Sequence, residues 1–307
     1  MTGTALDGVM SFPVTAFHPD GALNLAAYGA HVADQVAAGP SAVFVACGTG
    51  EFFSLDLEEY GHVVRAAVEA ATGTVPVFAG VGYGTRLAIR LARVAQEAGA
   101  QGLLILPPYL VRAPQDGLVA HYRAVAAATD LPAIVYQRDN VRLTPEAAAE
   151  LVAVPNVIGL KDGLGDLDLM QRITGAIRDA RRHDPSIADP VLLNGLPTAE
   201  MTALAYWGIG VRSYSSAVFC FAPDIALAFN KALRAGDTDL VEAYLDGFFR
   251  PLVELRSRGA GYAVSLVKAG VRLAGADVGP VRHPLTDPPP EHVRQLRDII
   301  AAGRVIG

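Results

Sequence analysis

The chain has 307 residues, of which 51% are hydrophobic and 18% are charged, and its formal net charge is −6. This composition allows a large buried core, within one large domain or two ordinary ones. The acidic balance, without a basic cluster interleaved with aromatic residues, argues against nucleic-acid binding. The sequence contains no uninterrupted apolar run of about eighteen residues, so we predict no membrane-spanning helix.

Other chemical classes are also disfavoured by the residue inventory. The chain has two cysteines, Cys47 and Cys220, which are too few and too far apart to indicate a disulfide framework or a zinc site. Its seven histidines show no H-x-H or H-E-x-x-H spacing, so we expect no metal site. The segment Met1–Asp7 lacks a basic stretch followed by an apolar one, so we expect no secretory signal and a cytoplasmic protein.

Short apolar runs recur along the first two thirds of the chain, with helical stretches between them. The predicted strands are 8–14, 42–46, 75–79, 102–106, 133–136, 157–161, 191–194 and 210–214. Most are continuously apolar, which is typical of strands covered on both faces. Eight strand–helix units predict a (β/α)8 TIM barrel, and the alternative is a doubly wound open sheet.

The predicted helices carry start and stop signals. Asp56 and Glu59 form a candidate capping box, and Thr144 precedes a proline at the first helical position. Gly39 and Gly99 follow alanine-rich helices and suit left-handed caps. After Tyr214 the predicted elements are all helical, at 223–234, 238–256, 260–274 and 290–302. We therefore predict a catalytic barrel domain over 1–235 and a C-terminal helical extension over 236–307.

Lysine is rare in this chain, and one lysine lies in an unusual place. Of the three lysines, Lys231 and Lys268 fall in predicted helices, whereas Lys161 ends the apolar run that starts at Val157. A lysine in an apolar site can lose its proton and act as a nucleophile. The alternative is a partly buried ion pair of Lys161 with Asp162 or Glu51.

Further candidates stand at the ends of other predicted strands, where a barrel carries its reactive residues. The turn Gly48-Thr49-Gly50 could hold a carboxylate on its amides and the Thr49 hydroxyl, or it could be an ordinary glycine turn. Tyr136 could move protons on and off an imine, or it could be a core aromatic residue. The ends of the last two predicted strands carry Asn194, Gly195, Ser213, Ser215 and Ser216.

These strand ends, in this order, resemble the family of lysine-dependent aldolases and dehydratases typified by dihydrodipicolinate synthase and N-acetylneuraminate lyase. The resemblance covers nearly the whole chain. It implies that Gly48-Thr49-Gly50-Glu51 binds a carboxylate, that Tyr136 relays protons and that Lys161 forms the Schiff base. Gly195 matches a glycine whose backbone lines the family's site. The family commonly forms tetramers of paired dimers, so we expect a homo-oligomer, either a dimer or a tetramer.

Two departures separate the chain from the synthase branch of this family. Tyr136 is followed by Gln137-Arg138-Asp139 where the synthase has Asn-Val-Pro, and Tyr109-Leu110 stands where it has two tyrosines. The sequence is instead similar to family members that remove water and carbon dioxide from a six-carbon keto-diacid.

That similarity implies a small-molecule keto-diacid substrate and a reaction through one imine, without a metal or an organic cofactor. Five polar residues are candidates for the distal end of the substrate: Arg138, Asn194, Ser213, Ser215 and Ser216. Two alternatives are a pyruvate-dependent aldolase of the same family and a non-catalytic sensor of sugar acids.

Overall fold

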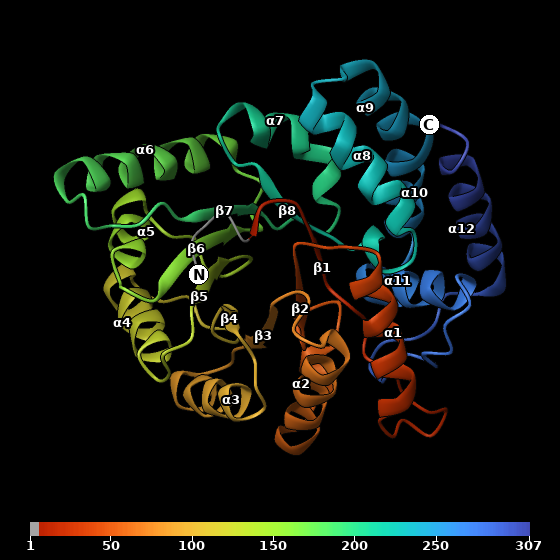
Figure 1. Cartoon of the computed structure of the whole chain (residues 1–307), viewed down its shortest axis with the longest axis horizontal. Coiled ribbons are helices and arrows are strands. Elements are labelled where there is room, and N and C mark those ends of the chain that lie inside the picture. The colour runs from red at the N-terminus through yellow and green to blue at the C-terminus, as the bar shows by residue number, and fades with distance from the viewer. Residues whose placement is uncertain (1–5) are drawn as a thin grey trace.

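The computed structural model describes residues 6–307, and its eight strands form a closed parallel barrel (Figure 1). The strands are β1 Val9–Ser11, β2 Ala42–Val45, β3 Val77–Val81, β4 Gly102–Ile105, β5 Ala133–Gln137, β6 Val157–Asp162, β7 Val191–Asn194 and β8 Ser213–Ser216. Each strand pairs with the next in the chain, and β8 closes the barrel on β1. The predicted (β/α)8 barrel is therefore confirmed, and the doubly wound open sheet is wrong.

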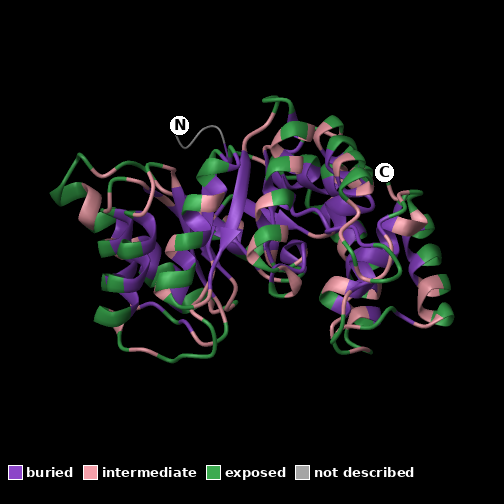
Figure 2. Ribbon diagram, turned by 90° about the horizontal axis from the view of Figure 1, so that it is seen from below, coloured by how far each residue is buried: buried purple, intermediate pink, exposed green. Residues whose placement is uncertain are grey.

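Helices surround the barrel and leave its strands buried. They are α1 Leu25–Ala37, α2 Leu57–Ala71, α3 Thr85–Glu97, α4 Gln115–Ala126, α5 Pro145–Val152, α6 Leu167–His183, α7 Ala203–Gly208 and α8 Pro223–Ala235. Every residue of β1 to β5 is buried, whereas the helices expose their outer faces (Figure 2). Burial on both faces explains why the strands read as continuous apolar runs.

The predicted helix signals are present. Asp56 accepts a hydrogen bond from the Glu59 amide at 2.8 Å, and the Glu59 carboxylate accepts one from the Asp56 amide at 3.2 Å. Thr144 caps α5 through its side chain. Gly39 and Gly99 have φ of +83° and +92°, in the left-handed region that glycine tolerates best. Local sequence therefore determines where these helices begin and end.

β1 is shorter than the predicted 8–14, and two other strands start two or three residues later than predicted, for local backbone reasons. β3 begins at Val77 rather than 75 because Pro76 has no amide hydrogen to donate to a neighbouring strand. β8 begins at Ser213 rather than 210 because Gly210, at φ +88°, still belongs to the left-handed end of α7. The second shift moves Ser213 from the end of its strand to the start.

Further helices follow the barrel and lie along one side of it, near α1 (Figure 1). They are α9 Thr238–Tyr244, η5 Leu245–Phe249, α10 Arg250–Arg256, α11 Tyr262–Leu273 and α12 Pro290–Gly303. The predicted helix over 238–256 thus contains a π-helical segment, η5, between its two α-helical parts. α8 ends at Ala235 with Gly236 in the left-handed conformation, and the domain division at that point stays a prediction.

Within residues 6–307, no helix is both long enough and apolar enough to span a bilayer. The expectation that the chain has no secretory signal depends largely on residues 1–5, which lie outside the described part of the chain.

Candidate active site

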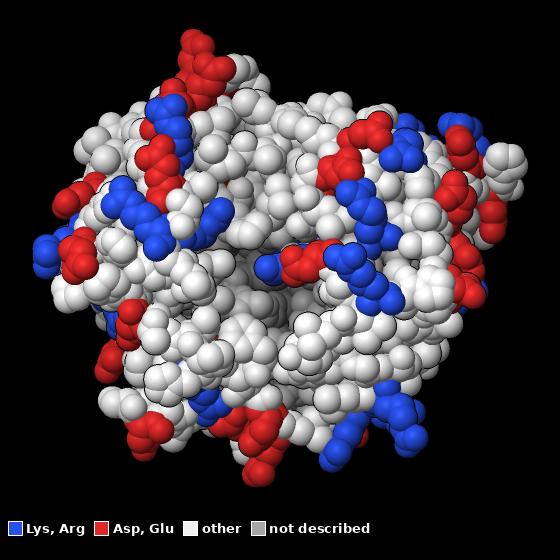
Figure 3. All heavy atoms as spheres, turned by 180° about the vertical axis from the view of Figure 1, so that it is seen from behind, with Lys and Arg blue, Asp and Glu red and all other residues white. Residues whose placement is uncertain are grey.

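A cavity of about 790 Å³ opens at the carboxyl ends of the strands. Its lining includes Thr49 after β2, Tyr136 on β5, Lys161 on β6, Gly195 after β7 and Ser215 on β8. A hollow is visible near the middle of this face, and most of the atoms around it are uncharged (Figure 3). The barrel therefore brings together residues that lie more than a hundred positions apart in the sequence.

Lys161 reaches into this cavity from β6 with only 5% of its surface exposed. Its Nζ lies 4.0 Å from the centroid of the Phe12 ring and 4.6 Å from that of Tyr136. Within residues 6–307 it makes no ion pair and no hydrogen bond. The pKa of Lys161 is lowered to about 7, chiefly by burial; Cys47 opposes this shift and the positive charge of Arg138 contributes to it. A large share of Lys161 is consequently a neutral amine at neutral pH.

The two carboxylates considered as partners of Lys161 are bound elsewhere. Asp162 accepts hydrogen bonds from Gln137 Nε2 at 2.8 Å and from the Tyr206 hydroxyl. Glu51 forms an ion pair with Lys268, whose Nζ lies 2.8 Å from its Oε1. The alternative of an ion pair between Lys161 and either carboxylate is therefore wrong.

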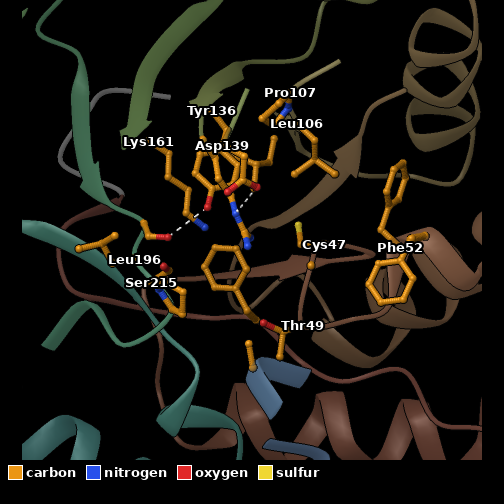
Figure 4. Close-up of a pocket in the computed structure, with 18 of the residues that line it drawn as sticks. Cys47, Thr49, Phe52, Leu106, Pro107, Tyr136, Asp139, Lys161, Leu196 and Ser215 are labelled. Atoms are coloured by element: carbon orange, nitrogen blue, oxygen red, sulfur yellow. Dashed lines mark hydrogen bonds and ion pairs between the residues drawn. The ribbon is translucent and has the colours of Figure 1, made fainter. Parts of the chain in front are cut away.

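Tyr136 lies beside Lys161 in the cavity (Figure 4). Gly195 also lines the cavity. The Tyr136 hydroxyl donates a hydrogen bond to the Gly195 carbonyl at 3.1 Å. A Cβ added at Gly195 would lie 2.6 Å from Lys161 Cε, so a larger residue would push the lysine aside. Burial raises the pKa of Tyr136 to about 12, which keeps the phenol protonated at neutral pH. The geometry thus places a proton donor next to a neutral amine.

The turn after β2 lies on the opposite side of the cavity, where Figure 4 shows Thr49. Gly48 and Thr49 both line the cavity. The turn is closed by the Glu51 amide, which donates to the Gly48 carbonyl at 3.2 Å. Thr15 Oγ1 holds the next residue by donating to the Gly50 carbonyl at 2.6 Å. This turn is better suited to bind an anion than a flexible loop would be, because its backbone is fixed before any ligand binds.

Arg138 lies at the rim of the cavity with its side chain 42% exposed. Its Nε forms an ion pair with Asp139 Oδ2 at 2.9 Å, and Asp139 also lines the cavity. Arg112 is a second guanidinium in the lining, which the sequence did not single out. The cavity therefore has its positive charges at the mouth and its neutral amine below.

Of the predicted serines, Ser215 lines the cavity and Ser213 does not. Ser213 stands at the start of β8, at the other end of the barrel, where its Oγ donates to the Leu6 carbonyl at 3.2 Å. This placement corrects the expectation for Ser213, and its cause is the late start of β8. The hydroxyl of Ser216 donates a hydrogen bond to the buried carboxylate of Glu200, so its proton is already used within the protein.

Asn194 also lies outside the lining. Its amide nitrogen donates to the Ala199 carbonyl at 2.9 Å and to Thr202 Oγ1 at 2.8 Å. Its Oδ1 accepts a hydrogen bond from the Leu196 amide at 3.2 Å. All three contacts tie the loop after β7 together, so the structure corrects Asn194 from a substrate contact to a loop anchor.

Several residues of the site had not been singled out from the sequence. Phe12 lies against Lys161, and Ala263 and Val264 of α11 line the cavity. Cys47, which begins the strand end that carries the turn at Gly48, also lines the cavity. Burial raises the pKa of the Cys47 thiol to about 12, so it is neutral at neutral pH. Small apolar residues carry no sequence pattern that would mark them as site residues. Lys268 does carry one, because it shares with Lys161 the rarity of lysine in this chain, and it could have been noticed. Residues 6–307 contain no group of three or more His, Cys, Asp and Glu side chains arranged to hold a metal ion.

The fold and the site define a (β/α)8 barrel protein with a buried lysine at the carboxyl end of β6 that has no ion-pair partner in the described part of the chain. Residues 5–303 match the model of the Dihydrodipicolinate synthetase family, and the chain belongs to that family. The resemblance proposed from the strand ends is therefore confirmed at the level of the family.

Relatives and solved structures support this membership. A protein of Streptomyces coelicolor named "Probable 5-dehydro-4-deoxyglucarate dehydratase 1" is 60% identical over 303 residues, covering 99% of this chain and 95% of the relative. A "Probable 5-dehydro-4-deoxyglucarate dehydratase" of Streptomyces griseus is 62% identical, covering 97% of this chain and 92% of the relative. The crystal structure of dihydrodipicolinate synthase from Bacillus clausii superposes with a TM-score of 0.88 at 26% identity, covering 99% of both chains.

Proposed function

We propose that this chain is a decarboxylating dehydratase that converts 5-dehydro-4-deoxy-D-glucarate to 2,5-dioxopentanoate, water and carbon dioxide through an imine on Lys161. The observation that carries this proposal is the unpaired Lys161 amine, whose pKa burial lowers to about 7 inside the cavity. The names of relatives that are 60% and 62% identical support the choice of substrate.

The first half of the proposed reaction forms the imine and removes water. The Lys161 amine attacks the C5 ketone, while the neighbouring C6 carboxylate binds to the turn at Gly48 and Thr49. Tyr136 supplies and removes the protons needed to expel the C5 oxygen as water. The protonated imine acidifies C4, since the electrons left by the C4 proton delocalise onto nitrogen. The resulting enamine expels the C3 hydroxyl, which leaves as water and creates a conjugated iminium.

The second half uses the same nitrogen as electron acceptor. The C1–C2 bond breaks, C1 leaves as carbon dioxide, and its electron pair moves through the conjugated system to the nitrogen of Lys161. Protonation at C4 restores the imine, which water hydrolyses to the product ketone. The enol at C2 and C3 then becomes the aldehyde. One imine therefore serves both eliminations, and the atoms balance without an oxidant or a reductant.

We assign the distal half of the substrate to the mouth of the cavity. Arg138 lies at the rim, and its guanidinium could exchange Asp139 for the C1 carboxylate in a charge-assisted contact. Ser215 is the remaining predicted hydroxyl that lines the cavity. The homo-oligomer and the cytoplasmic location stay predictions.

Turnover with identification of the product tests this function. The purified protein is incubated with the keto-diacid, and carbon dioxide and 2,5-dioxopentanoate are measured. We expect both in equal amounts, and neither with a Lys161→Met variant. Release of pyruvate by retro-aldol cleavage would instead identify an aldolase, and ligand-dependent stabilisation without turnover would identify a sensor.

A further inference from the structure

We propose that Lys268, in the C-terminal helix α11, is a positioning residue that fixes the carboxylate-binding turn after β2. The inference rests on the proposed function, because it assumes that Gly48 and Thr49 bind the substrate carboxylate. Lys268 does not line the cavity and touches no reacting atom; it acts through Glu51.

The ion pair of Lys268 and Glu51 is completely buried, and both side chains are 0% exposed. Glu51 Oε1 accepts from Lys268 Nζ at 2.8 Å, and its Oε2 accepts from the Arg282 amide at 2.9 Å. Both oxygens of this carboxylate are therefore held by residues more than two hundred positions further along the chain. Burial lowers the pKa of Lys268, and the Glu51 charge opposes that shift.

Glu51 also has an unusual backbone. Its φ is +54°, in the left-handed region that non-glycine residues seldom adopt. In this conformation its amide donates to the Gly48 carbonyl and closes the turn. Such a conformation persists only where the surroundings enforce it. The side chain of Glu51 is held from outside the turn by Lys268 and by the Arg282 amide, and of these two contacts only the one with Lys268 is an ion pair.

The surroundings of the pair are equally ordered. The Phe17 ring centroid lies 4.2 Å from Lys268 Nζ and 4.1 Å from Arg282 Cζ, so both cations lie against one aromatic ring. The Arg282 guanidinium is fixed in turn by Glu59 and by the Ser54 carbonyl at 2.6 Å. The pair therefore sits in a network that leaves the turn little freedom.

Helix α11 connects this network to the cavity directly. Val264 lines the cavity, and Lys268 lies four residues later, on the same face of the helix. A methionine could fill the space of Lys268 without the cost of burying a charge, and replacing buried ion pairs by apolar residues is often neutral for stability. The presence of a charged lysine here is explained if its ion pair with Glu51 sets the geometry of the turn. Buried ionic groups can serve in this way to specify one structural arrangement.

The test compares carboxylate binding in matched variants of the full chain. Because Lys268→Met alone leaves Glu51 buried and unpaired and could prevent folding, the main variant is the neutral pair Glu51→Gln with Lys268→Met. Lys231→Met, which removes the exposed lysine of α8, is the control. The readouts are the dissociation constant for pyruvate, the KM and kcat for the keto-diacid, and the melting temperature.

We expect the double variant to keep its melting temperature and to bind pyruvate about tenfold more weakly, with KM rising by a similar factor and kcat changing less. Lys231→Met should match the unmodified chain in every readout. Equal pyruvate binding and equal KM in the double variant would overturn the positioning role and leave the proposed function intact. Failure of the unmodified chain to bind pyruvate or to turn over the keto-diacid would contradict both proposals.

Discussion

Two buried lysines in this protein have opposite surroundings. Lys268 is 0% exposed and its Nζ lies 2.8 Å from a carboxylate oxygen, whereas Lys161 is 5% exposed and makes no ion pair within residues 6–307. Burial acts against the charge of both, but Glu51 opposes that effect only at Lys268. A partner carboxylate thus separates a lysine that holds structure from one that can react.

Of the two lysines, Lys161 is the one whose burial lowers the stability of the fold. A buried amine without a partner costs free energy, because charging it in an apolar site is unfavourable and a neutral amine loses its contacts with water. The barrel tolerates that cost at the end of β6, in a cavity that is also lined by Tyr136 and by the turn at Gly48 and Thr49. At α11 the same residue type is fully paired. Changes to either lysine should therefore affect different properties.

The largest expected effect is the loss of turnover in Lys161→Met. Without the amine no imine forms, so we expect a loss of at least about a thousandfold, comparable to removal of an essential nucleophile. The melting temperature should stay equal or rise, since the change removes an unpaired polar group. Lys268→Met should instead cost about 3–5 kcal/mol of unfolding free energy, because the buried Glu51 carboxylate loses its cationic partner. Turnover assays and thermal unfolding of both variants check this contrast.

Tyr136→Phe should have the next largest effect. The variant keeps the ring against Lys161 but removes the hydroxyl that donates to Gly195. Loss of a positioned proton carrier costs about 10²- to 10³-fold in kcat, while the dissociation constant for pyruvate should change little. A parallel loss of binding and kcat would show that the hydroxyl holds the site together rather than moving protons. Steady-state kinetics and calorimetry distinguish the two.

Gly195→Ala should reduce activity by displacing Lys161, with a further close contact 2.9 Å from the Asp162 carbonyl oxygen. The added methyl would lie 2.6 Å from Lys161 Cε and would push the amine from its place. We expect a loss of about tenfold to a hundredfold in kcat/KM, the usual cost of a small misplacement. Gly208→Ala is a matched control, because a Cβ there meets nothing within 4 Å. If both variants kept full activity, the close packing of Lys161 against Gly195 would have no role in catalysis.

The smallest expected change is a shift of the pH profile. Lys161 must be neutral to attack, and its pKa is lowered to about 7, so kcat/KM should rise as the pH increases through about 7 and then level off. A lysine with an unperturbed pKa would place that rise at a pH of about 10.4. Because the Arg138 charge lowers the pKa of Lys161, Arg138→Gln should move the rise to higher pH. An unchanged rise in that variant would mean that the two charges do not interact.

Much of the fold could be predicted from the sequence because its signals are local. Continuous apolar strands, the capping box at Asp56 and the left-handed glycines after α1 and α3 depend on neighbouring residues only. The rarity of lysine and its position after an apolar run likewise pointed to Lys161. The ends of other predicted strands pointed to Tyr136 and the turn at Gly48, and the family resemblance supported the roles expected of them.

The rest depends on contacts between distant segments. The pairing of Glu51 with Lys268 joins residues 217 positions apart, and no local pattern announces it. Asn194 lies at the predicted strand end, but its side-chain amide points to the loop at Ala199 rather than to the cavity. Ser213 was misplaced because one left-handed glycine delayed the start of β8. Direction and register of side chains were therefore the features that sequence alone did not provide.

Chemical trapping of the imine distinguishes the two lysines most directly. The protein is incubated with pyruvate, reduced with borohydride, digested and analysed by peptide mass spectrometry, with Lys161→Met as the control. We predict one reduced adduct, on Lys161, and none on Lys231 or Lys268. A label on another lysine, or no label at saturating pyruvate, would contradict the assignment of Lys161 as the reactive amine.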